Sequence, residues 1–210
     1  MAAEAIVSAG REAILARVGQ TRSSEPVVRA YRHRGGRTAA ERVALFCDRA
    51  GEYRAEVRRV DDVAAAVREA CRELGVHRLA IPPALPAAWR PADLELVEDA
   101  GLTPRELDAL DGVLTGSTVS IAETGTIALT GGPSEGRRAL TLVPDLHICV
   151  VEEASVVELV PEALALLGEL VARERRPVTL VSGPSATSDI ELSRVEGVHG
   201  PRTLVVLVTA

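Results

Sequence analysis

The feature that most constrains the fold of this chain is the close alternation of short apolar runs and amphipathic helical patterns from residue 43 onward. The pattern predicts helices at 43–50, 61–74 and 103–110, and strands at 54–59, 77–81 and 94–97. Asp61 is the expected N-cap of the second helix, and Gly75 is expected to end it in the left-handed conformation. Strands connected through helices run parallel and are covered by helices on both faces.

Farther along the chain, some apolar runs lie too close together for helical connections. Short strands are expected at Val113–Leu114, Thr118–Ile121 and Thr126–Leu129, joined by turns at Gly116–Ser117 and Glu123–Gly125. Turns this short require antiparallel pairing. Further strands are expected at Leu146–Val151, Val178–Val181 and Leu204–Val208, with a helix starting near Pro161. The sequence therefore predicts a three-layer α/β/α domain with a mixed, mostly parallel sheet.

The first 42 residues have a different character. Residues 2–18 carry apolar side chains at helical spacing, and residues 20–42 form a polar, arginine-rich arm. We expect a division into an N-terminal helix with its arm, 1–42, and one α/β domain, 43–210. The arginines of the arm fit either a docking patch or a solvated linker.

Charge and composition exclude several classes of function. The net charge of −6 disfavours binding to nucleic acid or an anionic membrane. All 24 basic residues are arginine, which excludes Schiff-base catalysis and a P-loop lysine. Three scattered cysteines lack the spacing of a zinc or iron–sulfur site, so buried free thiols are expected. No apolar run is long enough to span a membrane, and we expect a cytoplasmic protein without a bound cofactor.

The strongest candidate site is the glycine- and hydroxyl-rich stretch 111–134, which surrounds Glu123. Glu123 lies in a tight turn, where it could act as a base, as an acyl-accepting nucleophile or as an acceptor for a ligand. An exposed turn carboxylate is the structural alternative. The neighbours expected to bind ligand are Ser117, Thr124, Gly125 and Thr126.

A second candidate segment, 182–191, follows the expected strand 178–181. Ser182, Gly183 and Ser185 could present backbone N–H groups to an anion at the carboxyl end of that strand. Asp189 is a further candidate catalytic group. A capping box formed by Ser188 and Glu191 would explain part of the pattern without any ligand.

Histidines provide the third candidate feature. His147 lies within an apolar strand, where a hydrogen-bonded core residue is expected, whereas His33 and His77 are expected at the surface. His199 lies among turn residues and is the better candidate for a catalytic side chain, and Gly200 beside it is expected to bind ligand. No local spacing indicates a metal site. We therefore predict one cleft at the carboxyl ends of the strands, with Glu123, Asp189 and His199 as catalytic residues.

Four motifs, read together, resemble the LUD-domain family. They are SIAETGTIAL at 120–129, LVPDLHICVV at 142–151, SGPSATSDIE at 182–191 and GVHGPRTLVVLV at 197–208. The resemblance implies a fold similar to the sugar-phosphate isomerase and CoA-transferase group. It also implies a role in oxidising L-lactate to pyruvate together with iron–sulfur partner proteins. The cysteine-rich segments of longer relatives are absent here, so the chain is not expected to hold a cluster.

Three functions remain open on this reading. The first is a subunit without a cluster in a lactate-oxidising system. The second is a separate acyl- or CoA-transferase that uses Glu123 as its nucleophile. The third is a sensor of a small carboxylate or phosphorylated ligand.

Overall fold

The computed structural model describes residues 2–20, 30–187, 195–197 and 199–210. The chain divides into two compact units, Met1–Tyr31 and Arg32–Ala210. The first unit contains helix α1 (Ala2–Gln20), as the apolar spacing predicts. The boundary expected at residue 42 stays a prediction.

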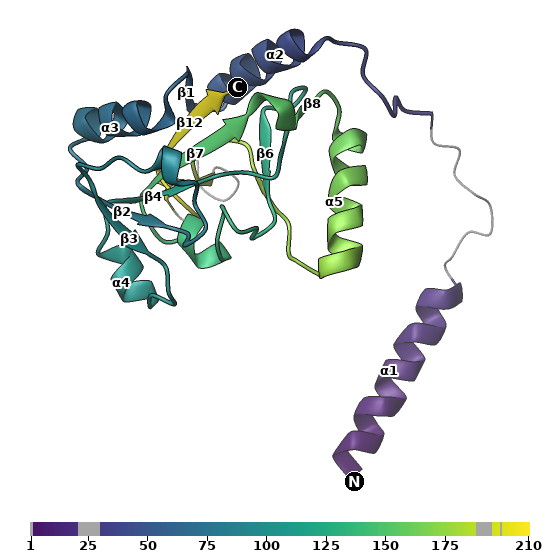
Figure 1. Ribbon diagram of the computed structural model, residues 1–210. Helices are drawn as coiled ribbons and strands as arrows, with labels where there is room; N and C mark the ends of the chain where they lie inside the picture. Colours follow the sequence, from purple (N-terminus) through teal and green to yellow (C-terminus); the bar gives the residue numbers. More distant parts are fainter. Residues whose placement is uncertain (1, 21–29, 188–194, 198) are drawn as a thin grey trace. The chain divides into compact units, whose positions relative to one another are not determined.

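The larger unit is built on a six-stranded parallel sheet with strand order β1-β12-β7-β4-β2-β3 (Figure 1). Its strands are β1 (Glu56–Arg59), β2 (Arg78–Ile81), β3 (Glu95–Glu98), β4 (Gly112–Thr115), β7 (Leu146–Glu152) and β12 (Thr203–Thr209). The central strands β7 and β12 pair over seven residues, from Leu146 opposite Thr203 to Glu152 opposite Thr209. Both are buried on both faces, as strands between two layers of the domain must be.

Helices cover both faces of this sheet. On one face, α3 (Val63–Leu74) packs Val67, Ala70 and Cys71 against the sheet. On the other face lie α2 (Ala39–Glu52), α4 (Pro104–Asp108) and the 3₁₀ turn η2 (Arg138–Thr141). Two further 3₁₀ turns are η1 (Ala87–Trp89) and η3 (Glu153–Ser155). The α/β class, with a mostly parallel arrangement and helices on both faces, is confirmed.

A second, four-stranded sheet packs on the α2 side, with strand order β8-β5-β6-β9. Its strands are β5 (Val119–Ile121), β6 (Thr126–Leu129), β8 (Val156–Val157) and β9 (Thr179–Val181). One face contacts the parallel sheet, and α5 (Val160–Glu174) covers the other through Ala163 and Leu167 (Figure 1). A two-stranded ladder, β10 (Ala186–Thr187) with β11 (Val195–Glu196), completes the described strands.

Local signals in the sequence set several boundaries. Thr103 caps α4 with a capping box, with Pro104 at its first position, and Gly75 ends α3 at φ 68°. The N-cap of α3 is Asp62 and not Asp61, because Asp62 accepts the hydrogen bond from the N–H of Ala65.

The turn at Glu123–Gly125 joins an antiparallel pair, β5 and β6, as predicted. The expected turn at Gly116–Ser117 does not form a hairpin, because β4 belongs to the parallel sheet and β5 to the second sheet. The Ser117 hydroxyl donates to the carbonyl of Val150, at 3.0 Å, where the chain crosses between the sheets. The antiparallel strands therefore lie in a separate sheet.

Candidate functional site

The turn that carries Glu123 is fixed by close packing against the end of α2. Gly125 has φ 59°, and a Cβ built on it would lie 2.5 Å from the backbone nitrogen of Ala50. That distance leaves no room for a side chain. Glycine is required here by both the backbone conformation and the contact with α2.

The Glu123 carboxylate faces the arm that precedes α2. Arg32 donates to it at 3.1 Å, and the two side chains are 63% and 48% exposed. The backbone N–H of Glu123 is bound to the carbonyl of Glu158 at 3.0 Å. Glu123 is therefore a solvated carboxylate with an arginine partner.

The same stretch of arm is anchored by a second, buried carboxylate. Glu158 is 2% exposed and accepts from the backbone N–H of Arg37 at 2.7 Å and from its guanidinium at 2.8 Å. The Arg37 N–H and guanidinium lower the pKa of Glu158, against the opposing effect of burial. A Cβ at Gly35 would lie 2.1 Å from Oε2 of Glu158. Residues 32–37 thus contact the domain through Glu123 and Glu158.

Hydroxyl groups connect the Glu123 turn to the segment that begins at Ser182. Thr124 and Thr126 share a hydrogen bond of 2.7 Å, and Thr126 bonds to Ser182 at 2.8 Å. Gly183 has φ 135° and packs on the same end of α2, since a Cβ there would lie 2.5 Å from the carbonyl oxygen of Tyr53. The two candidate segments therefore lie side by side.

A cavity of about 260 Å³ opens beside the second segment. We call it the His147 cavity. It is lined by five of the predicted site residues, which are Ser182, Gly183, Ser185, His199 and Gly200. The other described candidates, Ser117, Glu123, Thr124, Gly125 and Thr126, are not among its lining residues. Asp189 and the expected Ser188–Glu191 capping box fall outside the described residues.

The cavity differs in position from the predicted cleft. Ser182 follows the carboxyl end of β9, as expected, but β9 belongs to the second sheet. In the parallel sheet the cavity meets the amino ends of β7 and β12, through His147 and Leu204. This cavity therefore lies elsewhere than the cleft predicted at the carboxyl ends of parallel strands, which stays a prediction, because strand patterns alone do not reveal the sheet to which each strand belongs.

His147 forms the buried part of this cavity. It is 2% exposed, and its Nε2 lies 2.8 Å from the Thr115 hydroxyl. That hydroxyl also lies 2.9 Å from the carbonyl oxygen of Gly116, to which it can donate while it accepts from Nε2–H of His147. Burial lowers the pKa of His147 to about 4. The imidazole is neutral at pH 7, and in the tautomer that donates from Nε2 to Thr115 its Nδ1 is a hydrogen-bond acceptor.

The exposed part of the cavity carries Arg138, which the sequence reasoning did not select. Its guanidinium donates to the Thr179 hydroxyl at 2.6 Å. The signal that could have identified it is the pair Arg137–Arg138 after a glycine-rich loop. Arg137 is bound to Asp99, at 2.7 and 2.9 Å, whereas Arg138 has no ion-pair partner within the described part of the chain.

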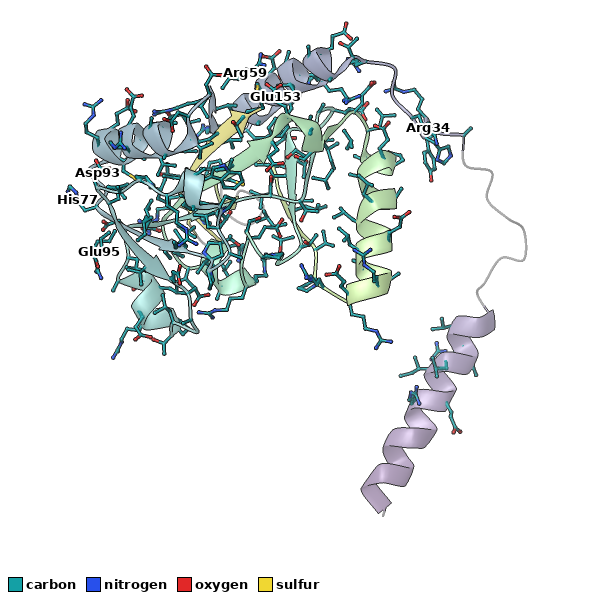
Figure 2. All side chains as sticks on the ribbon, viewed as in Figure 1. Arg34, Arg59, His77, Asp93, Glu95 and Glu153 are labelled. Atoms are coloured by element: carbon teal, nitrogen blue, oxygen red, sulfur yellow. The ribbon has the colours of Figure 1, made fainter. Side chains whose placement is uncertain are left out.

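The Ser185 loop is organised by its own hydrogen bonds. Its Oγ accepts from the backbone N–H of His199 at 3.0 Å, and its N–H donates to the carbonyl of Pro201 at 2.8 Å. His199 is exposed, as expected for a wet site, and His33 and His77 are also exposed (Figure 2 labels His77). The loop thus presents a hydroxyl and an imidazole at the mouth of the cavity.

The glycine-rich loop after β6 is held by a third carboxylate. Glu135 is 2% exposed and accepts from the N–H groups of Thr130 and Gly132, at 2.6 and 2.9 Å, and from the Thr118 hydroxyl. This loop leads directly into η2, whose first residue is Arg138. Glu135 therefore has a structural role in positioning the segment that supplies Arg138.

The thiols behave as the sequence predicts. Cys71 and Cys149 are buried and free, and Cys47 is half-buried and free. Burial raises the pKa of Cys71 to about 11 and that of Cys149 to about 12. No three potential metal ligands cluster within the residues that the structure describes. Within the same residues, no helix combines the length and apolar character needed to cross a bilayer.

Most of the α/β unit matches a known protein family. Residues 55–209 match the LUD domain family. A protein of Deinococcus radiodurans named Lactate utilization protein C is 45% identical over 172 residues, or 80% of each chain. A Bacillus mycoides protein, Lactate utilization protein C 1, is 37% identical over 117 residues, which cover 51% of this chain and 50% of that one.

A solved structure supports the same assignment. The crystal structure of a DUF162 family protein from Deinococcus radiodurans aligns with a TM-score of 0.73 at 37% identity. The alignment covers 83% of this chain and 100% of that one. The chain therefore belongs to the LUD-domain family.

Proposed function

We propose that this chain is a subunit of an L-lactate-oxidising system that carries no iron–sulfur cluster itself and works with iron–sulfur partner proteins. The observation that carries the proposal is the 45% identity, over 80% of both chains, to a protein named Lactate utilization protein C. The LUD domain match, residues 55–209, also contains the described residues that line the His147 cavity.

The chemistry of the reaction supports a division of labour. Oxidation of L-lactate to pyruvate releases two electrons and two protons, which an acceptor must take up. Clusters of the ferredoxin type are held by four cysteine thiolates. This chain has three cysteines, and Cys71 and Cys149 are buried in different apolar clusters. The proposal therefore assigns electron transfer to the partner proteins and ligand binding to this chain.

The test is reconstitution. The tagged chain is co-expressed with the iron–sulfur proteins, and co-purification and lactate-dependent reduction of an electron-accepting dye are measured with and without it. We expect a stable complex and a rate that falls severalfold when the chain is omitted. A chain that always elutes alone, with partners that oxidise lactate at full rate without it, would overturn the proposal.

Acyl transfer through Glu123 remains a separate prediction with its own test. A carboxylate can serve as the acyl-accepting nucleophile, and Glu123 contacts Arg32, but it is not among the residues described as lining the cavity. Intact-mass measurement after incubation with acyl-CoA decides the matter. An acyl adduct that disappears in Glu123→Ala would support transfer, and the absence of any adduct would exclude it.

A further inference from the structure

We propose that the His147 cavity binds a small hydroxycarboxylate, with Arg138 pairing the carboxylate and Nδ1 of His147 accepting the ligand hydroxyl. The proposal rests on the proposed function, because it assigns the substrate class of that system to a site on this chain. Neither residue was selected as a ligand-binding residue from the sequence.

The charge of the residues that line the cavity favours a ligand with a single negative charge. Among its described lining residues Arg138 carries the single formal charge, and no carboxylate lines it. The Arg138 guanidinium donates one N–H group to the Thr179 hydroxyl at 2.6 Å, so its other N–H groups can bind an anion. A carboxylate of charge −1 is neutralised by one guanidinium, and its two oxygens match the planar donor pair of arginine. A phosphate dianion would keep an uncompensated charge.

The buried part of the cavity selects the rest of the ligand. In the tautomer that we assign to His147, Nε2 donates to the Thr115 hydroxyl at 2.8 Å and the neutral ring keeps an acceptor at Nδ1. Burial holds the pKa of this ring far below neutrality, so it stays an acceptor across the physiological range. A ligand hydroxyl can donate to such a nitrogen, whereas a methyl group or a carbonyl oxygen cannot.

Size limits the ligand to a small molecule. The volume of about 260 Å³ is below the range of drug-sized pockets, which begins at about 300 Å³. A three- or four-carbon acid fits in this space together with water. A nucleotide or an acyl-CoA would have to extend out of it.

The test is calorimetric titration of the full-length protein with L-lactate, propionate and inorganic phosphate. Propionate retains the carboxylate and lacks the hydroxyl. We expect L-lactate to bind at least tenfold more tightly than either of the others, because an unmatched buried acceptor costs binding energy. Tighter binding of phosphate, or equal binding of L-lactate and propionate, would overturn the assignment.

Substitutions test whether Arg138 binds the ligand carboxylate. Arg138→Gln is expected to weaken L-lactate binding at least tenfold, since it removes a charge-assisted hydrogen bond. Arg137→Gln is the matched control, because this neighbouring guanidinium pairs with Asp99 and does not line the cavity. Equal loss of binding in both variants, or no loss in Arg138→Gln, would overturn the role of Arg138.

The role of His147 is tested without a substitution in the core. Long-range ¹H–¹⁵N NMR of the imidazole reports the tautomer and the hydrogen bond at each nitrogen. We expect L-lactate to shift the Nδ1 resonance and to leave that of Nε2 nearly unchanged, while propionate shifts neither. A shift confined to Nε2 would overturn the assignment.

The two proposals fail in different ways. If the chain binds L-lactate as described but is dispensable in reconstitution, the proposed function fails and the cavity assignment stands. If the chain is required for oxidation but binds no hydroxycarboxylate, the cavity assignment fails and the proposed function stands.

Discussion

Two glycine-bearing segments pack against the same end of α2, and they differ in what their other residues do. The turn at 123–126 is closed: Gly125 contacts Ala50, and Glu123 pairs with Arg32. In the segment at 182–185, Gly183 lies equally close to Tyr53, but the segment also lines a cavity. Glycine and hydroxyl density therefore marks close packing in one segment and an accessible surface in the other.

Gly125→Ala should have the largest effect, because it breaks the closed turn. The new Cβ would require a left-handed alanine, which costs about 1 kcal/mol, and would overlap the backbone of α2, which costs about 1–3 kcal/mol more. We expect the free energy of unfolding to fall by about 2–4 kcal/mol, measured by urea denaturation.

Gly75→Ala is the matched control for the backbone term. Gly75 has φ 68°, and no atom lies within 4 Å of its Cβ position. Gly75→Ala should therefore lower the free energy of unfolding by only about 1 kcal/mol. Similar losses of unfolding free energy in the two variants would mean that the contact between the turn and α2 does not contribute to stability.

The cavity side of the comparison can be examined through its buried histidine. The folded-state pKa of His147 is about 4, against 6.5 for an exposed histidine. Below pH 6.5 the unfolded chain therefore takes up a proton that the folded chain does not. Stability should fall as the pH falls from 6.5 toward 4, by about 3 kcal/mol in total from this residue.

The measurement is urea denaturation at several pH values in wild type and in His147→Gln, which cannot titrate. Carboxylates such as Glu158 also lose stability in acid, but they do so equally in both proteins. We expect a shallower pH dependence in the variant between pH 6.5 and 4. Parallel curves would show that water reaches the imidazole in the buried part of the His147 cavity.

The arm that covers the closed turn provides a third comparison, between adjacent glycines. A Cβ at Gly35 would overlap Glu158, whereas no atom lies within 4 Å of the Cβ position at Gly36. Gly35→Ala should release the arm and increase the rate of limited proteolysis at the arginines of residues 32–37. Gly36→Ala should be cleaved at the wild-type rate. Equal cleavage rates of the two variants would mean that the Glu158 side chain moves aside and leaves the arm in place.

Sequence patterns captured the elements of this fold better than their arrangement. Thr103, Pro104 and Gly75 mark helix ends through local hydrogen bonding and backbone conformation, so they can be read directly from the sequence. The pairing of β5 with β6 was predictable for the same reason, since a short turn connects them. The division of the strands between two sheets depends on contacts between residues that are distant in sequence. No local sequence pattern reveals it.

The candidate site shows the same limit. Ser182, Ser185 and His199 were predictable because flexible and hydroxyl-bearing residues cluster around them. Arg138 joins the cavity only because η2 packs near β9, where Arg138 reaches Thr179, 41 residues away in sequence. His147 was correctly predicted to be a hydrogen-bonded core residue, and its additional position in the cavity wall follows from tertiary packing alone.

The smallest effect is expected from the ion pair at the closed turn. Arg32 and Glu123 are both largely solvated, at 63% and 48% exposure, and such pairs contribute about 0–1 kcal/mol. A double-mutant cycle with Arg32→Gln and Glu123→Gln should give a coupling energy of about 0.5 kcal/mol or less, decreasing further in high salt. A coupling above about 1.5 kcal/mol that resists salt would contradict the comparison. It would mean that charge, and not the packing of Gly125, keeps this turn closed.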